Sequence, residues 1–556
     1  MRDFVIALSG EAGQGLNTIG DMLALSLFRN GYCIFTDKSY HSRIRGGEYV
    51  YRIRISDSPL YSMRQEFDLI VSLSKSTTIS QLQYFHDGTK LIYDSDSDHV
   101  SSKDFDFEVK AMGFPFKSIA KEAGEPRAQN VVALGGILGL FNVKREIPSK
   151  LIEETFSGKE EIIKANLEAL KRGYDLSLPI EIPRLDVQEH NYYLMNGTEG
   201  TGLGAIAAGC KFLAAYPMTP GTGVMTFLAS NSEKHGIVVE QAEDEIAAVN
   251  MVIGGAFAGA RSLVTTSGGG FALMQEGVSL AAMTETPLVM VDAQRPAPAT
   301  GLPTRTAQED LLFVVNAGHG EFPKYVVSPR TPKETFELTE KAFYIADKYQ
   351  IPSIILLTES LVDSSATIEA PIHKEEFLQR FITEGNEEYR RYEITENGIS
   401  PRAIPGGKAT VRVDSDEHDE AGYITEDLEI RSKMVDKRMK KMEGLLGELS
   451  APAKFNLDAP LVLVGWGDSW GAIDEFAMSR KDVGYVHYSE VFPIDPSIKE
   501  ELEGKKLCSI EGNFTGQFAT LLRSVTGLQI DHVGRYDGRP ISANWIERSL
   551  KKEGMI

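Results

Sequence analysis

A threonine between two prolines is the first residue of this sequence whose placement could serve chemistry. In the stretch AAYPMTPGTGVM, residues 214–225, Thr219 follows Pro217 by two positions and directly precedes Pro220. Proline cannot continue a helix interior, and it moves the residue before it away from helical backbone angles. The chain therefore turns here, and Thr219 is held firmly at the end of a predicted strand–helix unit.

A short acidic run offers a second candidate. Glu243, Asp244 and Glu245 begin a predicted helix in the stretch EDEIAAVNMVIGGAFAGA. Acids are ordinary in a first helical turn, because the helix dipole favours them there. The alanines and glycines that follow indicate very close packing of this helix, as at a subunit or domain interface. A carboxylate at the mouth of such an interface would be desolvated, and it could share a proton with a ring nitrogen.

An arginine after a buried strand is the third candidate. Arg295 directly follows the apolar stretch PLVMVDAQ and precedes a long loop rich in proline, glycine and threonine. In a parallel α/β sheet, ligands bind in the crevice beyond the carboxyl ends of the strands. Arg295 at that position suits a carboxylate, which it can hold with two hydrogen bonds. A structural ion pair is the alternative interpretation.

The N-terminal stretch SGEAGQGLNTIG is a glycine loop between a predicted strand and a predicted helix. Gly10, Gly13 and Gly15 would let backbone N–H groups approach an anion at the helix N-terminus, which predicts a phosphate-bearing ligand. The spacing departs from the dinucleotide fingerprint, yet Asp37 lies near the end of the second strand, where a ribose-binding acid would be. A nicotinamide or flavin site, another phosphate ligand and a purely structural turn all remain open.

Arginines follow the glycine loop in the chain. The stretch YHSRIRGGEYVYRIRIS contains Arg43 and Arg45 beside the pair Gly46–Gly47. An arginine-rich strand next to a glycine loop suits a polyphosphate, although arginines on an edge strand would look the same.

The elements that position these residues form four zones. Strand-like and helical patterns alternate in 1–183, in 190–375 and in 456–556, which predicts an α/β fold with several open parallel-sheet domains. The zone 376–455 is charged and irregular and contains a basic helical run, which is typical of a solvated connector.

Composition narrows the class of protein. The 556 residues carry a formal net charge of −21, which argues against nucleic acid and acidic membrane surfaces as partners. Three widely separated cysteines cannot by themselves form a metal cluster or a disulfide framework. No apolar run has the length of a membrane span, and the N-terminus has no signal-peptide pattern. We therefore expect a cytoplasmic protein with no resident metal on this chain.

Several of these motifs together resemble one enzyme family. The stretches AAYPMTPGTG, EDEIAAVN, TTSGGG and VDAQRPAPATGLPTRT resemble the α subunit of the 2-oxoacid:ferredoxin oxidoreductases. The stretches GEAGQGLNTIG and RIRGGEYVYRIRIS resemble the γ domain of those enzymes, fused ahead of α, and VGWGDSWGAIDEF with EGNFTGQFATLLR resembles their transketolase C-terminal-like domain. The likeness covers nearly the whole chain, including a pyrimidine-binding thiamine diphosphate domain at 190–375.

The resemblance implies a reaction and roles for the candidate residues. Such enzymes oxidatively decarboxylate a 2-oxoacid with coenzyme A and thiamine diphosphate, and pass the electrons through iron–sulfur clusters to ferredoxin. Glu245 matches the glutamate that binds the aminopyrimidine ring and favours the tautomer that removes the thiazolium proton. Thr219 matches the threonine facing the substrate, with Pro217 beside it at the cofactor, and Arg295 matches the arginine that binds the substrate carboxylate.

The N-terminal motif has a role in the same comparison. Gly10, Gly13 and Gly15 match a glycine loop that would approach coenzyme A, and we expect Arg45 at the same ligand. Fused chains of this size resemble the 2-oxoglutarate branch most.

Departures from the family pattern leave the 2-oxoacid open. Met218 stands where isoleucine is usual, and Gly221–Thr222 replaces a pair of serines. Pro296 and Ala297 stand where glycines often follow the arginine. Pyruvate or another 2-oxoacid, including an arylpyruvate, is the alternative substrate. A non-catalytic scaffolding subunit and a nicotinamide-linked dehydrogenase are the alternative functions.

Two motifs of such enzymes are absent from this sequence. It contains neither a GDG-type diphosphate–metal motif with a downstream asparagine nor a C-x-x-C set for a cluster. We therefore expect a separate β subunit to supply the Mg²⁺–diphosphate half of the site and a [4Fe–4S] cluster, and to be the subunit on which ferredoxin docks. The predicted assembly is a dimer of αβ heterodimers, in which this chain alone is inactive.

Overall fold

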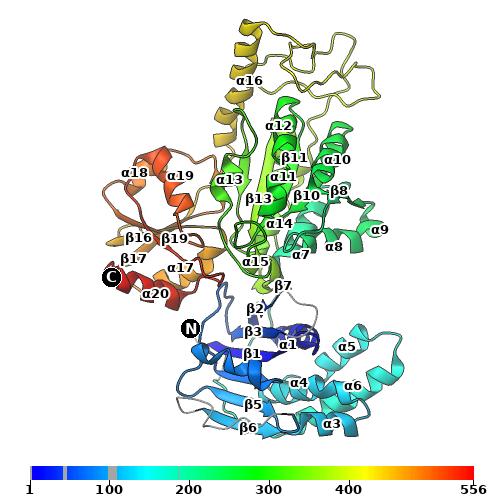
Figure 1. Ribbon diagram of the computed structural model, residues 1–556, viewed down its shortest axis with the longest axis vertical. Coiled ribbons are helices and arrows are strands. Elements are labelled where there is room, and N and C mark those ends of the chain that lie inside the picture. The colour runs from blue at the N-terminus through cyan, green and yellow to red at the C-terminus, as the bar shows by residue number, and fades with distance from the viewer. Residues whose placement is uncertain (1–2, 42–46, 98–108, 184, 186) are drawn as a thin grey trace. The chain divides into compact units, whose positions relative to one another are not determined.

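The computed structural model describes residues 3–41, 47–97, 109–183, 185 and 187–556 (Figure 1). The chain divides into two compact units. The first comprises Met1–Met195 and Asp363–Ala370, and the second comprises Asn196–Val362 and Pro371–Ile556. The predicted zone 190–375 thus contributes a short segment to the first unit, because a strand within 363–370 completes that unit's sheet.

The first unit is built on an eight-stranded sheet with the order β6-β5-β4-β1-β3-β2-β14-β7. Its strands are β1 (Asp3–Glu11), β2 (Cys33–Tyr40), β3 (Glu48–Ser56), β4 (Leu69–Ser72), β5 (Lys90–Asp94), β6 (Lys110–Phe114), β7 (Tyr193–Met195) and β14 (Ala366–Ile368). Its helices are α1 (Leu16–Arg29), α2 (Lys75–Ile79), α3 (Phe116–Glu122), α4 (Gln129–Leu140), α5 (Glu146–Thr155) and α6 (Glu160–Tyr174).

This sheet is mixed, whereas the sequence pattern favoured a parallel one. Strand β1 pairs in parallel with β4, and β4, β5 and β6 continue in parallel, but β3 is antiparallel to both β1 and β2. The physical reason is the short connection between β2 and β3, which has no room for a crossover helix and can only return the chain antiparallel.

Both faces of the first sheet are buried. Along β1, Phe4, Ile6 and Leu8 belong to one hydrophobic cluster and Val5 and Ala7 to another, as the two-residue period of a strand requires. Helices α1, α4, α5 and α6 contribute to the first of these clusters.

The second unit contains a seven-stranded sheet with the order β18-β12-β13-β11-β10-β8-β9. Its strands are β8 (Phe212–Ala215), β9 (Val238–Gln241), β10 (Ser262–Thr266), β11 (Leu288–Gln294), β12 (Tyr325–Val327), β13 (Pro352–Thr358) and β18 (Glu490–Phe492). All pairs are parallel except β12 with β18. The carboxyl ends of β8, β10, β11 and β13 therefore lie at one edge of the sheet, where the predicted crevice belongs.

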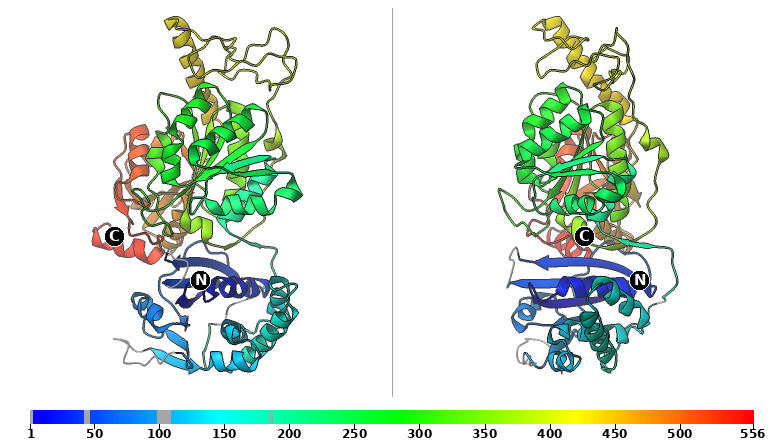
Figure 2. Two further views of the ribbon diagram at one scale, coloured as in Figure 1. Left: turned by 45° about the vertical axis from the view of Figure 1, so that its right-hand side comes forward. Right: turned by 90° about the vertical axis from the view of Figure 1, so that its right-hand side faces the viewer.

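Helices cover both faces of this sheet, as Figure 2 shows. Alternate residues of β11 divide between the two faces: Met290 packs with one cluster, and Val289 and Val291 with the other. The helices of the unit around this sheet are α7 (Gly197–Ala207), α8 (Thr222–Ser230), α9 (Ser232–His235), α10 (Glu245–Phe257), α11 (Gly268–Leu273), α12 (Gln275–Met283), α13 (Leu311–Val315), α14 (Pro332–Tyr349) and α15 (Glu359–Asp363). Helices α10, α11 and α12 lie on the Met290 face, and α7, α8 and α14 on the other.

A five-stranded sheet in the order β15-β17-β16-β19-β20 forms the C-terminal part of the second unit. Its elements are β15 (Ala453–Phe455), β16 (Leu461–Trp466), β17 (Val483–Tyr488), β19 (Lys506–Glu511), β20 (Asp531–Gly534), α17 (Trp470–Met478), α18 (Ile498–Leu502), α19 (Gln517–Thr526) and α20 (Ala543–Lys552). Val462, Val464 and Trp466 of β16 share one hydrophobic cluster with Ile354 and Leu356 of β13. The two sheets of this unit are therefore joined by a continuous core.

The charged zone 376–455 folds back on the second unit through the long helix α16 (Leu428–Leu446). Lys437 and Lys441 of α16 reach the buried carboxylate of Glu285, both at 2.5 Å. No helix in the described part of the chain combines the length and the apolar character that crossing a bilayer requires.

Candidate active site

Thr219 lies in the turn that joins β8 to α8, just beyond the carboxyl end of β8. Its side chain is exposed, whereas Pro217 and Met218 are half-buried. A Cβ atom at Gly221 would collide with the carbonyl oxygen of Thr266, so this position needs glycine rather than the serine of the usual pattern. This close approach to the end of β10 fixes the turn that carries Thr219.

Arg295 reaches the same turn from the end of β11. Its Nη1 atom donates a hydrogen bond to the carbonyl oxygen of Thr219 at 2.6 Å. Partial burial lowers the pKa of Arg295, and the carboxyl of Asp310 opposes that shift. The two residues assigned to the substrate by the sequence therefore lie together at the edge of the sheet.

Glu245 is the first residue of α10, and its side chain points into the protein. Asp244 caps the helix by accepting a hydrogen bond from the backbone N–H of Ala247 at 2.8 Å. Glu245 is 3% exposed, and its Oε1 atom has no hydrogen-bond partner. Burying an unsatisfied carboxylate oxygen is costly unless a ligand or a proton satisfies it. The carboxylate thus fits a cofactor group that donates a hydrogen bond.

A run of three glycines brings this carboxylate close to the turn of Thr219. At Gly270, in the first turn of α11, an added Cβ atom would stand 2.7 Å from Oε1 of Glu245. At Gly269 an added Cβ atom would lie 3.9 Å from its nearest neighbour, Sδ of Met218. The first turn of α11 therefore lies between Glu245 and the Pro217–Pro220 turn. Because this turn consists of glycines, it presents backbone without side chains to both.

The third glycine, Gly268, adjoins Asp310, one of two buried acids that were not predicted as site residues from the sequence. Oδ2 of Asp310 lies 2.5 Å from where a Cβ atom of Gly268 would be. Asp292, in β11, is fully buried, and neither of its carboxylate oxygens has a partner. In the sequence, the only indication of a role for Asp292 was an acidic residue inside the otherwise apolar strand PLVMVDAQ.

The loop from Arg295 to Asp310 is tied to the C-terminal part of the unit. Oε1 of Gln308 accepts a hydrogen bond from the N–H of Gly512 at 2.8 Å, and its Nε2 donates to the carbonyl oxygen of Trp466 at 2.9 Å. The backbone of Gln308 also bonds to Gly512 and to the side chain of Asn513. These bonds hold the loop on the carboxyl ends of β16 and β19.

The N-terminal glycine loop belongs to the first unit. Gly13 and Gly15 have φ angles of 96° and 75°, which favour glycine, and Gly15 begins α1 without any side-chain cap. Gly10 lies against Gln14, whose Oε1 accepts a hydrogen bond from the N–H of Glu11 at 2.8 Å. The uncapped first turn leaves backbone N–H groups that suit an anion.

The acid proposed for a ribose is engaged elsewhere. Asp37 is buried, and its Oδ2 accepts a hydrogen bond from Nη2 of Arg52 at 2.5 Å. Arg54, on the same strand, pairs with Asp3. Strand β3, which carries both arginines, lies inside the sheet between β1 and β2 rather than at its edge. Asp37 therefore does not support a nicotinamide site. Arg43 and Arg45 lie outside the described residues.

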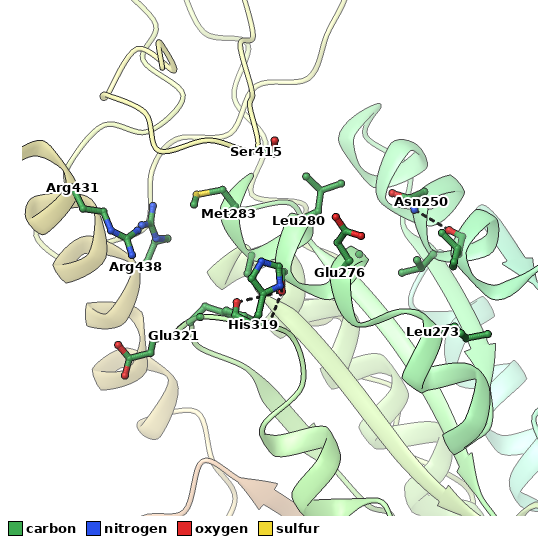
Figure 3. A pocket seen from close by; sticks show the side chains of 17 residues that line it. Asn250, Leu273, Glu276, Leu280, Met283, His319, Glu321, Ser415, Arg431 and Arg438 are labelled. Atoms are coloured by element: carbon green, nitrogen blue, oxygen red, sulfur yellow. Dashed lines mark hydrogen bonds between the residues drawn. The ribbon is translucent and has the colours of Figure 1, made fainter. Parts of the chain in front are cut away.

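A cavity of about 700 Å³ opens along α10 and α12 (Figure 3). Figure 3 shows Arg431 and Arg438 of α16 across the cavity from Glu276 and Leu280. Both arginines pair with Glu417, so they present little free positive charge. Helix α10 lines the cavity with exposed Ile246 and Asn250 and with buried Val249, within the first two turns after Glu245.

Comparison with protein families matches most of the chain. Residues 203–437 match the family described as pyruvate flavodoxin/ferredoxin oxidoreductase, thiamine diphosphate-binding. Residues 5–176 match the family described as pyruvate ferredoxin/flavodoxin oxidoreductase.

Individual relatives match over the full length. The 2-oxoacid:ferredoxin oxidoreductase subunit alpha of a Sulfolobus species is 31% identical, over 98% of this chain and 96% of the relative. The 2-oxoglutarate oxidoreductase subunit KorA of Mycobacterium tuberculosis is 27% identical, over 99% of this chain and 91% of the relative. A solved 2-oxoglutarate:ferredoxin oxidoreductase from Magnetococcus marinus, with 2-oxoglutarate, coenzyme A and succinyl-CoA bound, superimposes with a TM-score of 0.93 at 31% identity and complete coverage of both chains.

Proposed function

This chain belongs to the α subunits of the 2-oxoacid:ferredoxin oxidoreductases, and from that membership we propose that it acts on 2-oxoglutarate with Glu245 as its cofactor-activating residue. The overall reaction converts the 2-oxoacid and coenzyme A into an acyl-CoA and CO₂, with two electrons passed to ferredoxin. The same residues serve the reverse direction, because a catalyst acts on both directions of one reaction.

The observation that carries the proposal is the unpartnered Oε1 of Glu245 beside Gly270. A buried carboxylate at this position accepts a hydrogen bond from the aminopyrimidine ring and keeps that proton at a defined atom. Thiamine diphosphate bound there would supply a nucleophilic carbon for the 2-oxo group and an electron sink for the bonding pair that remains when CO₂ leaves. The same carboxylate argues against a scaffolding role, because burying it without a ligand costs stability.

Thr219 and Arg295 orient the substrate in this proposal. The hydroxyl of Thr219 donates to an oxygen of the 2-oxoacid, and the guanidinium of Arg295 binds the carboxylate. The names of the Magnetococcus and Mycobacterium relatives support 2-oxoglutarate, whereas the two matched families are named for pyruvate. Substrate profiling decides between these two acids.

Coenzyme A is assigned to the glycine loop of the first unit. Gly13 and Gly15 keep the backbone open at the uncapped start of α1, which suits the phosphates of coenzyme A. The bound coenzyme A of the Magnetococcus enzyme supports this co-substrate.

A β subunit completes the site in this proposal. It supplies Mg²⁺, the diphosphate-binding residues, a [4Fe–4S] cluster and the surface on which ferredoxin docks. The exposed side of α10, with Ile246, Asn250, Met251 and Gly254, is uncharged and continues from Glu245, so we assign it to that interface. We expect a dimer of αβ heterodimers, which light scattering of the purified complex measures.

Glu245→Gln in the complex with the β subunit tests the proposed function. We expect a loss of turnover of about 100-fold or more, because an amide cannot hold the transferred proton. Glu243→Gln is the matched control, since Glu243 is an exposed carboxylate two residues away. Viologen reduction that depends on 2-oxoglutarate and coenzyme A is the readout, with pyruvate as the competing substrate. Unchanged turnover in Glu245→Gln contradicts the assignment.

A further inference from the structure

Two buried acids, Asp292 and Asp310, interact electrostatically with each other, and Asp310 also interacts with the arginine assigned to the substrate. Asp310 is 7% exposed and Asp292 is fully buried, and Oδ2 of Asp310 and both oxygens of Asp292 have no hydrogen-bond partner. Asp292 and Gln294 point to the same face of β11, and Oε1 of Gln294 accepts a hydrogen bond from the backbone N–H of Asp310 at 3.1 Å. The two carboxyls are thus part of one buried group at the end of β11.

The position of Asp310 is fixed from both sides. Gln308, two residues earlier, is bound to Gly512 and Trp466, and Nε2 of Gln517 donates to the carbonyl oxygen of Glu309 at 2.6 Å. Gly268 leaves the carboxyl of Asp310 in close contact with backbone of α11. The loop backbone at Asp310 is therefore held in place, with its carboxyl against the start of α11.

The charged groups around Asp310 are few. Asp292 comes from β11, Arg295 follows β11, and Glu309 precedes Asp310 in the loop, while α11 and α13 carry no titratable residue. The pKa of Asp310 is raised to about 7, mainly by burial; the charge of Glu309 also raises it, and Arg295 opposes the shift. Burial and the charge of Asp310 raise the pKa of Asp292 well above its ordinary value.

We propose that Asp310 is a positioning residue for substrate selection: its carboxyl takes up a proton when a 2-oxoacid carboxylate binds to Arg295. The proposal rests on the proposed function of Arg295. A charged Asp310 cancels part of the attraction between the guanidinium of Arg295 and an anion. A protonated Asp310 is neutral and does not weaken that attraction. The proton on Asp310 thereby controls the affinity of the site for carboxylate substrates.

The expected signature is a pH profile. For the complex with its β subunit, kcat/KM for 2-oxoglutarate falls by about fivefold to tenfold as pH rises from 6 to 8.5. In Asp310→Asn the fall is absent, and KM at pH 8.5 lies below that of the unaltered complex while kcat is retained. Glu309→Gln keeps the carboxyl of Asp310 but removes a neighbouring charge, so it moves the inflection to lower pH.

A binding measurement separates this effect from later steps. Calorimetry with 2-hydroxyglutarate, which has the same two carboxylates but no 2-oxo group, is run in two buffers of different ionisation enthalpy at pH 8. We expect proton uptake on binding, which Asp310→Asn abolishes. If Asp310→Asn fails to fold, the shifted inflection in Glu309→Gln carries the test.

The outcomes are distinguishable from those of the proposed function. An unchanged pH profile in both variants, or a uniform loss at every pH in Asp310→Asn, overturns the role of Asp310. Arg295→Gln tests the premise: if it leaves KM for 2-oxoglutarate unchanged, the substrate assignment of Arg295 is wrong. A raised KM in Arg295→Gln together with unchanged pH profiles refutes only the role of Asp310.

Discussion

At the residue scale, individual glycines shape the ligand sites because they have no side chain. At Gly268 and Gly270 the absence of a Cβ atom leaves room for Asp310 and Glu245, whereas at Gly269 an added Cβ would make only an ordinary contact with Met218. At Gly13 a φ of 96° sets the course of the loop after β1, and no atom stands within 4 Å of the place a Cβ would take. Glycine serves close approach in the first case and backbone conformation in the second.

Gly13→Ala tests the glycine loop. An alanine forced to this backbone conformation costs about 1–3 kcal/mol, so the loop is expected to relax away from its ligand. Losing one backbone hydrogen bond to a phosphate raises KM for coenzyme A by roughly tenfold. Steady-state kinetics with varied coenzyme A measure this change.

Gly88→Ala is the matched control for that variant. Gly88 has a φ of 98° and also has no atom within 4 Å of an added Cβ, but it lies in another loop of the same unit. Both variants should therefore lower stability alike, and only Gly13→Ala should change KM for coenzyme A. If the two variants have the same KM for coenzyme A, the assignment of coenzyme A to this loop is wrong.

At the element scale, helix α16 depends on one buried carboxylate. Glu285 follows α12 with a φ of 49°, and its two oxygens accept hydrogen bonds from Lys437 and Lys441. Nη2 of Arg391 donates to the backbone carbonyl oxygen of Glu285 at 2.6 Å. These cations hold the pKa of Glu285 well below its usual range despite burial. The connector is thus fastened to the seven-stranded sheet domain rather than merely solvated.

Glu285→Ala is expected to loosen α16. Removing one member of a buried ion cluster leaves uncompensated charges and costs about 3–5 kcal/mol. The thermal midpoint should fall by roughly 5–10 °C, and limited proteolysis should cut the connector first. Glu443→Ala, at an exposed position of α16, should change neither result. Equal stability of the two variants would contradict the fastening role.

At the scale of the whole molecule, the C-terminal part shares a core with the site-bearing sheet. Val464 of β16 packs in the same cluster as Ile354 and Leu356 of β13, and β18 adds a strand to the seven-stranded sheet. The opposite face of the five-stranded sheet has its own cluster, which includes Val483. Stability of the ligand site is therefore coupled to strands more than 100 residues away in the chain.

Val464→Ala tests this coupling by hydrogen exchange. Truncating a buried valine on the shared face should reduce amide protection in β12 and β13 as well as in β16. Val483→Ala removes the same atoms from the other face and should leave β12 and β13 protected. If both variants affect only the five-stranded sheet, the shared core does not act as one cooperative unit.

The candidate site was predictable where local chemistry is distinctive. The two prolines around Thr219, the acid run ending in Glu245 and the arginine after an apolar strand were each recognisable in the sequence, and Arg295 does contact the turn of Thr219. The mixed pairing in the first unit was not predicted, because strand direction depends on the connection and not on side-chain periodicity.

The amino-acid sequence by itself determined the family, the α/β class and the residue types at the edge of the sheet, because these depend on local pattern and motif. Only the tertiary structure decided that Asp310 interacts with both Asp292 and Arg295, that Asp37 is paired with Arg52, and that the C-terminal sheet shares the core of the site-bearing one. The physical reason is that burial, charge pairing and shared packing join residues far apart in the chain, and no local pattern records such contacts.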